Sequence, residues 1–154
     1  MSSSTSQAMT ATRSARIARI ASAVAIVVGL LFVVAGAATW FTVRANLAAE
    51  NITLGEDAAM FAGNVVDGPI DAWLQADVIN MHALEASEGK TYAELDREDP
   101  VRATVMNGSF LRASLFTSVV AFGVAALTTA TGLVLALLGY GLRSVARPAE
   151  GVRA

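Results

Sequence analysis

The chain has 154 residues, of which 55% are hydrophobic and 16% are charged, and its formal net charge is −2. It contains no cysteine, which excludes a disulfide framework, thiolate metal sites and a cysteine nucleophile. Twelve of the thirteen acidic residues lie between Glu50 and Asp99, so the small net charge averages over segments of very different character.

Two uncharged apolar stretches dominate the chain, Ile20–Val43 with 24 residues and Ala113–Leu142 with 30. At about 1.5 Å per residue, a helix of either length crosses a hydrocarbon core of about 30 Å. We therefore predict an all-α membrane hairpin of two transmembrane helices with a small helical extracytoplasmic domain between them. The predicted segments are a tail over 1–19, a transmembrane helix over 20–43, an acidic domain over 44–112, a second transmembrane helix over 113–142 and a tail over 143–154.

Arginines at the ends of the two stretches predict how the hairpin faces. Arg16 and Arg19 precede the first stretch and only Arg44 follows it, while Arg143 and Arg147 follow the second and only Arg112 precedes it. Positive residues near membrane helix ends favour the cytoplasmic side. Both comparisons predict a multi-pass protein of the plasma (inner) membrane with its N- and C-termini in the cytoplasm and residues 44–112 outside.

The first stretch has an alternative interpretation as a cleaved signal peptide. Ala35-Gly36-Ala37 resembles a small-residue cleavage site after an apolar run preceded by arginines. However, the uncharged run continues through Trp40 to Val43, which is long for a signal peptide, and a tryptophan suits an interfacial anchor. We expect the segment to be retained, and a mature chain starting near Ala38 would contradict this.

Small residues at four-residue spacing predict a contact between the two helices. The first stretch has Ala21, Ala25 and Gly29, and the second has Thr128, Gly132 and Ala136. Small residues allow close helix packing in lipid. An accidental pattern in an alanine-rich sequence is the alternative. Neither stretch contains an ionisable side chain, which argues against a transporter or proton channel built from this chain alone.

The domain between the stretches is predicted to be helical. Pro69 marks a helix start, and apolar residues at helical spacing predict a helix over 70–86 that ends before Gly89. The predicted apolar stripe consists of Ile70, Trp73, Leu74, Val78, Met81 and Leu84. The weaker pattern over 58–66 is compatible with a short helix, and Thr91 and Glu94 predict a capped turn. From Pro100 a helix can run into the second stretch, with an interruption favoured at Asn107-Gly108 and a continuous helix as the alternative. A domain this small is expected to need the hairpin or a partner for stability.

No residue pattern predicts catalysis. His82 is the only histidine, and with Asp77 and Glu85 it would make at most a weak metal site; a solvated helix face is the favoured interpretation. Ser109 and Ser114 flank Arg112, where hydrogen bonding is favoured over nucleophilic attack. The acidic run 94–99 lacks the pattern of a calcium loop and is interpreted as a solvated turn. We predict no catalytic, metal or cofactor site, and the three arginines before residue 20 do not indicate nucleic-acid binding.

The central segments resemble a family of small actinobacterial two-helix membrane proteins, over about residues 42–142. The residues that carry the resemblance are Glu56-Asp57-Ala58, Gly68-Pro69, Gln75–Ile79, His82, Gly89–Leu95 and Phe110–Ser118. Some relatives are labelled aromatic ring-opening dioxygenases. That chemistry uses two histidines and a carboxylate around iron, which one histidine does not supply.

These observations lead to one main functional hypothesis and several alternatives. We expect a non-enzymatic accessory or structural subunit of a membrane or cell-envelope complex, in contact with lipid and with another membrane protein or a second copy of itself. The main alternative is a membrane-anchored sensor whose acidic domain binds a cation or other ligand. An enzyme that depends on His82 and a holin-like pore are less favoured by the sequence.

Overall fold

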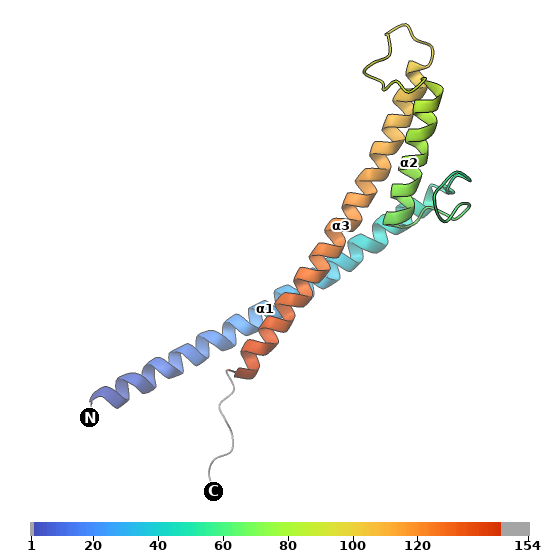
Figure 1. Ribbon diagram of the computed structural model, residues 1–154. Coiled ribbons are helices and arrows are strands. Elements are labelled where there is room, and N and C mark those ends of the chain that lie inside the picture. Colours follow the sequence, from blue (N-terminus) through green and yellow to red (C-terminus); the bar gives the residue numbers. More distant parts are fainter. Residues whose placement is uncertain (1, 146–154) are drawn as a thin grey trace. The chain divides into compact units, whose positions relative to one another are not determined.

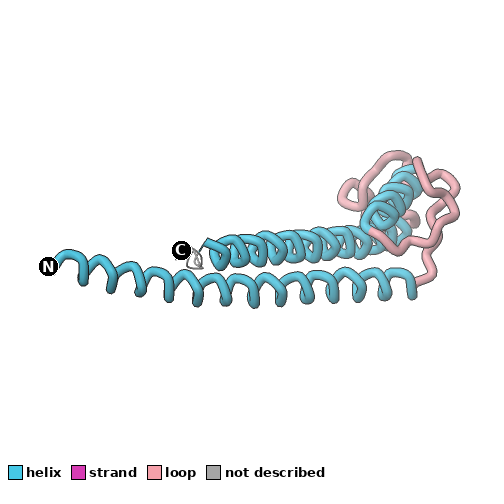
Figure 2. Tube along the Cα trace, turned by 90° about the horizontal axis from the view of Figure 1, so that it is seen from below, coloured by secondary structure: helices cyan, strands magenta, loops and turns pink. Residues whose placement is uncertain are grey.

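The computed structural model describes residues 2–145, with side chains from Ser14 onward. It contains the helices α1 (Ser2–Ala49), α2 (Pro69–Ala86) and α3 (Arg102–Val145), joined by loops (Figures 1 and 2). The only β pairing within 2–145 is an isolated bridge between Thr53 and Val65. The predicted all-α class is therefore confirmed. The contacts divide the chain into two compact units, one comprising residues up to 37 together with those from 126, the other Ala38–Ala125.

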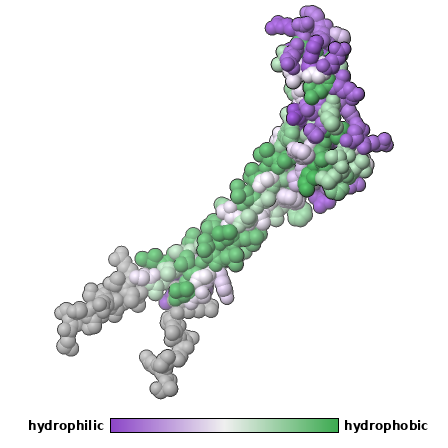
Figure 3. Space-filling view, viewed as in Figure 1, coloured by the Kyte–Doolittle hydropathy of each residue, from purple (hydrophilic) through white to green (hydrophobic). Residues whose placement is uncertain are grey.

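Two helical segments, Ser14–Ala49 and Arg102–Val145, are long and apolar enough to cross a membrane. In the most apolar 18-residue stretch of each segment, only 17% is buried. Most of the apolar side chains in these stretches therefore point away from the rest of the protein. Val34 on α1 and Leu137 on α3 are examples, with exposed fractions of 66% and 70%. Hydrophobic surface accordingly extends along both helices, whereas hydrophilic surface gathers around α2 and the segments beside it (Figure 3).

In the first unit, α1 and α3 pack backbone against backbone through glycines. A Cβ atom placed on Gly29 would lie 2.6 Å from both the Ala136 nitrogen and the Gly132 carbonyl oxygen. One placed on Gly139 would lie 2.8 Å from the Ser22 carbonyl oxygen. Contacts this short leave no room for a side chain, so the helices approach as closely as they do only because glycine occupies these positions. We call the contact formed by Ser22, Gly29, Gly132 and Gly139 the glycine seam.

The glycine seam confirms part of the predicted contact and corrects the rest. Gly29, Gly132 and Ala136 do meet, but Ala21 is exposed and lies outside the contact. The repeat is seven residues, from Ser22 to Gly29 and from Gly132 to Gly139, and not four. A seven-residue repeat keeps one seam facing the partner along a pair of supercoiled antiparallel helices, whereas four-residue spacing belongs to steeper crossings.

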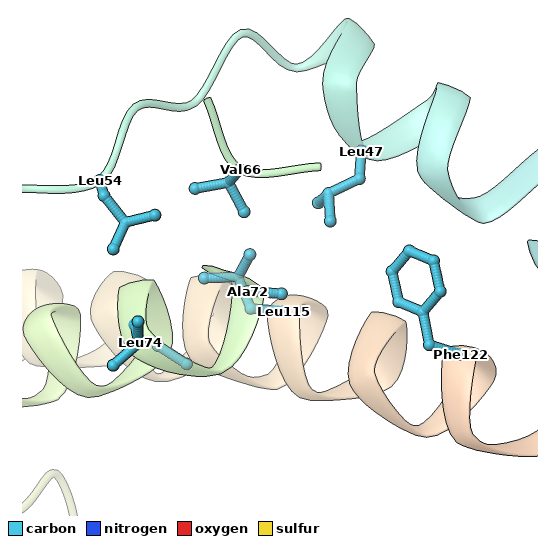
Figure 4. Packing of buried hydrophobic residues seen from close by; sticks show 8 residues of the cluster. Leu47, Leu54, Val66, Ala72, Leu74, Leu115 and Phe122 are labelled. Atoms are coloured by element: carbon cyan, nitrogen blue, oxygen red, sulfur yellow. The ribbon is translucent and has the colours of Figure 1, made fainter. Parts of the chain in front are cut away.

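The second unit has its own hydrophobic core, to which all three helices and the segment between α1 and α2 contribute. Figure 4 shows Leu47, Leu54, Val66, Leu74 and Phe122 directed toward a common interior. The buried cluster comprises Leu47, Leu54, Val66, Ala72, Leu74, Ala76, Leu115 and Phe122. Trp40 packs edge-on against Phe122 with ring centroids 4.7 Å apart, so this tryptophan belongs to the packing of the unit as well as to its surface.

The predicted helix over 70–86 is confirmed, with Pro69 in its first turn. Its end is closed by two hydrogen bonds, from the Gly89 amide to the Leu84 carbonyl and from the Glu88 amide to the Glu85 carbonyl. This pattern is a Schellman motif, which satisfies the last carbonyl groups of a helix. The stop occurs where Gly89 predicts it, but Glu88 is the residue at the left-handed capping position, with φ of 55°.

The buried face of α2 differs from the predicted stripe. Leu74 and Val78 are buried, as expected, but Ile70, Trp73 and Met81 are 58%, 50% and 44% exposed. Ala72 and Ala76 are fully buried in their place. The physical reason is that α2 is covered on two sides, because Gly108 of α3 lies against Ala83 and Ile79, and Gly55 of the preceding segment lies against Val78 and Gln75.

One further expectation is wrong, and one open alternative is decided. The segment 58–66 forms no helix; it is a loop tied to residues 52–54 by backbone hydrogen bonds, including Val66 to Ile52 and Leu54 to Asn64. Glycines at 55, 63 and 68 favour such a turn-rich loop over a helix. At Asn107-Gly108 the favoured interruption is absent, and the alternative of a continuous helix is confirmed, because α3 runs through both residues. Gly108 serves close packing there, since a Cβ at this position would lie 3.2 Å from the Ala83 side chain.

Candidate functional site

In the second unit, Arg44 near the end of α1 forms an ion pair with Asp67. The Arg44 Nη2 atom lies 2.6 Å from Asp67 Oδ2, and the Nε atom of the same guanidinium donates to this oxygen at 3.2 Å. The pair ties the final turns of α1 to Asp67, two positions before the start of α2. Because both side chains are partly exposed, the ion pair adds little to the free energy of unfolding, and its main effect is to fix the position of the loop before α2.

His82 is paired with a residue that the sequence analysis did not connect to it. Its Nε2 atom lies 2.5 Å from Asp57 Oδ2, and both side chains are more than half exposed. Asp77 and Glu85, which the sequence offered as partners of His82 in at most a weak metal site, form no hydrogen bond or ion pair with this ring. Asp57 is one of the residues that carry the family resemblance, but nothing in the local sequence pattern assigns it to His82, because the loop that delivers it has no regular period.

The acidic residues do not converge on a common point. Among residues 14–145, no group of three or more histidine, aspartate or glutamate side chains is arranged to hold a metal ion. In the run 94–99, Asp96 and Glu98 are exposed, as predicted for a solvated turn. Asp99 instead accepts a hydrogen bond from the Val101 amide at 2.9 Å, which helps to start α3.

The predicted capped turn from Thr91 to Glu94 is present as a single turn. A Glu94 carboxylate oxygen accepts hydrogen bonds from the Thr91 amide and from the Thr91 hydroxyl, each 2.8 Å long. Both hydrogen bonds lower the pKa of the Glu94 carboxyl, because they stabilise its charged form. The bond from the Thr91 amide has the larger effect. The turn places Tyr92 beside α3, where the Arg102 guanidinium carbon lies 4.1 Å from the centre of the Tyr92 ring.

One cavity in this unit has a volume of about 640 Å³ and opens between the end of α1, α2 and α3. Its lining combines apolar side chains with Asn46, Glu50, Gln75 and several hydroxyls. Two of those hydroxyls, on Thr117 and Ser118, donate to carbonyl groups one helical turn earlier. The lining therefore combines apolar surface with one carboxylate, on Glu50, and with neutral hydrogen-bonding groups.

A smaller cavity has a volume of about 300 Å³ and lies between α2, the turn from Thr91 and α3. Arg112, Asn80, Thr91, Tyr92 and Ser109 supply its polar lining, and no carboxylate belongs to it. As expected, the Ser109 hydroxyl hydrogen-bonds to the backbone, at 2.9 Å from the Val105 carbonyl oxygen. The sequence indicates Arg112 only as a charge that helps to predict membrane orientation. Its place in a cavity could not be predicted, because the residues that surround it come from three separate segments.

Comparison of the chain with protein-family models, curated proteins and solved structures finds no match. The resemblance to small two-helix membrane proteins therefore stays a prediction.

Proposed function

We propose that this chain is an integral membrane protein of the inner membrane, with α1 and α3 as its two spans. The observation that carries the proposal is the glycine seam. It packs two helices tightly through their smallest residues while their large apolar side chains remain exposed. That combination suits a lipid environment, in which helices associate through close packing and not through burial of large apolar groups.

The proposed orientation has both termini in the cytoplasm and the domain around α2 outside. It is supported by the arginine distribution at each apolar stretch, two residues against one in both cases. Since the chain has no cysteine, single-cysteine variants give an unambiguous test. Glu56→Cys, in the exposed loop before α2, should react with a membrane-impermeant maleimide in intact cells. Val145→Cys should react only after the membrane is opened, and the reverse pattern would invert the topology.

Within the membrane, we propose that the protein is a non-enzymatic accessory or structural subunit whose outside domain contacts another membrane protein or a second copy. Support comes from Ile70, Trp73 and Met81, which leave an apolar strip of α2 in solvent. Apolar residues left exposed along one helix favour an interaction surface.

Purification in mild detergent tests the accessory role. The intact chain should co-purify with a defined protein or as an oligomer, and Trp73→Gln should weaken that association. Glu85→Gln, another exposed position on α2, is the matched control and should retain the association. A chain that is consistently solitary would contradict the accessory role without affecting the membrane topology.

A membrane-anchored ligand-binding module is the second candidate function, and two cavities of the second unit favour it. A cationic ligand of the acidic domain should raise the thermal unfolding midpoint by mass action. Thermal unfolding with and without millimolar calcium or magnesium tests this version, and an unchanged midpoint with both ions would contradict cation binding.

A further inference from the structure

The side chain of Arg112 is a partly buried cation, one nitrogen of which has no hydrogen-bond partner. The Nε atom of this arginine has no contact with solvent and no hydrogen-bond partner, and the guanidinium carbon lies 5.2 Å from the centre of the Phe116 ring. Among residues 14–145 the guanidinium forms no ion pair. A partly buried cation without a counter-charge is unfavourable, so an oxyanion from outside the chain would complete this environment.

The cavity beside Arg112 offers further donors to such an anion. The hydroxyls of Thr91 and Ser109 are already used, by Glu94 and by a backbone carbonyl respectively. In contrast, the side-chain amide of Asn80 and the hydroxyl of Tyr92 form no hydrogen bond within the described part of the chain. The cavity lining therefore presents one cation and two donors with spare capacity.

Arg112 is the one charged side chain in the lining of this cavity. Arg102 lies against the Tyr92 ring and adds a second positive charge nearby. Two carboxylates are also close to the lining. Glu94 accepts two hydrogen bonds from Thr91, and Asp99 lines a neighbouring cavity together with Tyr92 and Arg102. The lining itself is therefore positively charged, while charges of both signs lie outside it.

We propose that this cavity binds a phosphate group, with Arg112 as the main ligand and Asn80 and Tyr92 as additional donors. The planar donor fork of arginine matches phosphate oxygens, and hydrogen bonds between charged partners are the strong ones. A volume of about 300 Å³ admits a headgroup-sized anion. The source is either free phosphate or the phosphate of an anionic lipid. The lipid source rests on the membrane placement proposed above, because Arg112 directly precedes the uncharged stretch from Ala113.

Two measurements on the full-length chain in an uncharged detergent distinguish these sources. Calorimetric titration with inorganic phosphate, against sodium chloride at equal ionic strength, measures binding of the free anion. Native mass spectrometry with added phosphatidylglycerol, against phosphatidylcholine, measures retention of an anionic lipid. Binding in the first measurement assigns a free anion, and selective retention in the second assigns a lipid headgroup. Absence of both would overturn the proposal.

Variants connect the binding to this cavity. Arg112→Gln should weaken it about 10- to 100-fold, because a charge-assisted hydrogen bond is lost. Arg97→Gln removes the same charge from an exposed position outside this lining and should leave the affinity unchanged. Equal affinities for the two variants would overturn the proposal.

Tyr92→Phe and Asn80→Ala provide a second test, since Arg112→Gln also removes a packed side chain. Each should weaken binding about 3- to 10-fold with unchanged helical circular dichroism. If neither has an effect, the cavity is not the binding site. Because all of these measurements use purified protein, an inverted topology in the cysteine labelling would refute the membrane orientation and leave phosphate binding in this cavity standing.

Discussion

Glu88 ends α2 in a left-handed backbone conformation, with φ of 55°, which a residue with a side chain adopts at a cost of about 1 kcal/mol or more. The following residue, Gly89, has φ of 83° and so also lies in this region. The Schellman closure therefore places two consecutive residues in the left-handed region, and only the second is the residue type suited to it.

Replacement of Glu88 by glycine should consequently stabilise the second unit. We expect Glu88→Gly to raise the free energy of unfolding by about 0.5–1 kcal/mol, because it removes the backbone strain at the capping position. Chemical denaturation monitored by circular dichroism measures the change. Asp77→Gly, at an exposed position in the middle of α2, is the matched control and should lower stability by about 1 kcal/mol. A loss of stability in Glu88→Gly would show that its side chain compensates for the strain.

The turn from Thr91 should depend on pH through Glu94. Since the pKa of this carboxyl is lowered in the folded protein, the stabilisation by its two hydrogen bonds is complete above the unfolded-state pKa. It is lost as the pH falls through the lowered pKa of the folded state. In an NMR titration, the Thr91 amide resonance should therefore shift at acidic pH in step with Glu94 protonation. Glu94→Gln should abolish this shift, whereas Glu98→Gln should leave it unchanged.

Local patterns in the sequence predict contacts between residues close in the chain and miss those that depend on loops. Thr91 and Glu94 are three residues apart, so the turn geometry alone brings them together. His82 and Asp57 are 25 residues apart, and their pairing depends on a loop without regular structure. The cavity at Arg112 is missed for the same reason, because its lining comes from three segments.

At the scale of the elements, the length and character of a helix follow from its sequence, but the face that it buries depends on its neighbours. The α2 start at Pro69 and its end before Gly89 are local signals, and both are confirmed. Which positions of α2 are buried does not follow from local signals. Ala72 and Ala76 are buried because other segments approach α2 closely on that side. Gly108 shows the same ambiguity, since glycine serves turns and close packing alike.

The glycine seam predicts a sharp difference between glycines on α3. Gly132→Ala would place a Cβ 2.5 Å from the Gly29 carbonyl oxygen and 2.7 Å from the Val33 nitrogen, so the helices would have to separate. Overpacking of this kind costs about 1–3 kcal/mol. A Cβ at Gly123 meets nothing within 4 Å, and Gly123→Ala should be neutral or stabilising by up to about 1 kcal/mol. Thermal unfolding in detergent compares the two variants, and equal midpoints would contradict the packing role of the seam.

At the scale of the whole molecule, the hydrophobic core of the second unit extends beyond the acidic segment at both ends. Predicted from charge alone, the domain between the apolar stretches comprises residues 44–112. The core of the second unit also includes Leu115 and Phe122, which are 4% and 1% exposed, and Trp40 packs against Phe122. Charge therefore locates the polar segment correctly, but it does not indicate which apolar residues are shared between that segment and the long helices.

This sharing predicts that the acidic segment does not fold alone. A fragment of residues 44–112 lacks Trp40, Leu115 and Phe122, and so leaves the inner faces of Leu47 and Ala72 without their partners. Such losses of buried contact amount to several kcal/mol, comparable to the whole stability of a domain this small. We expect the fragment to show no cooperative urea transition and poorly dispersed amide resonances.

A fragment of residues 38–125 restores the missing core and should unfold cooperatively in detergent. The comparison separates two causes of instability, because both fragments contain the same acidic residues and the same α2. If 44–112 folds cooperatively as a monomer, the adjoining ends of the apolar stretches are not needed for the core of the second unit. If only 38–125 folds, these ends belong to that core, and the two long helices stabilise the acidic segment by contributing their side chains to it.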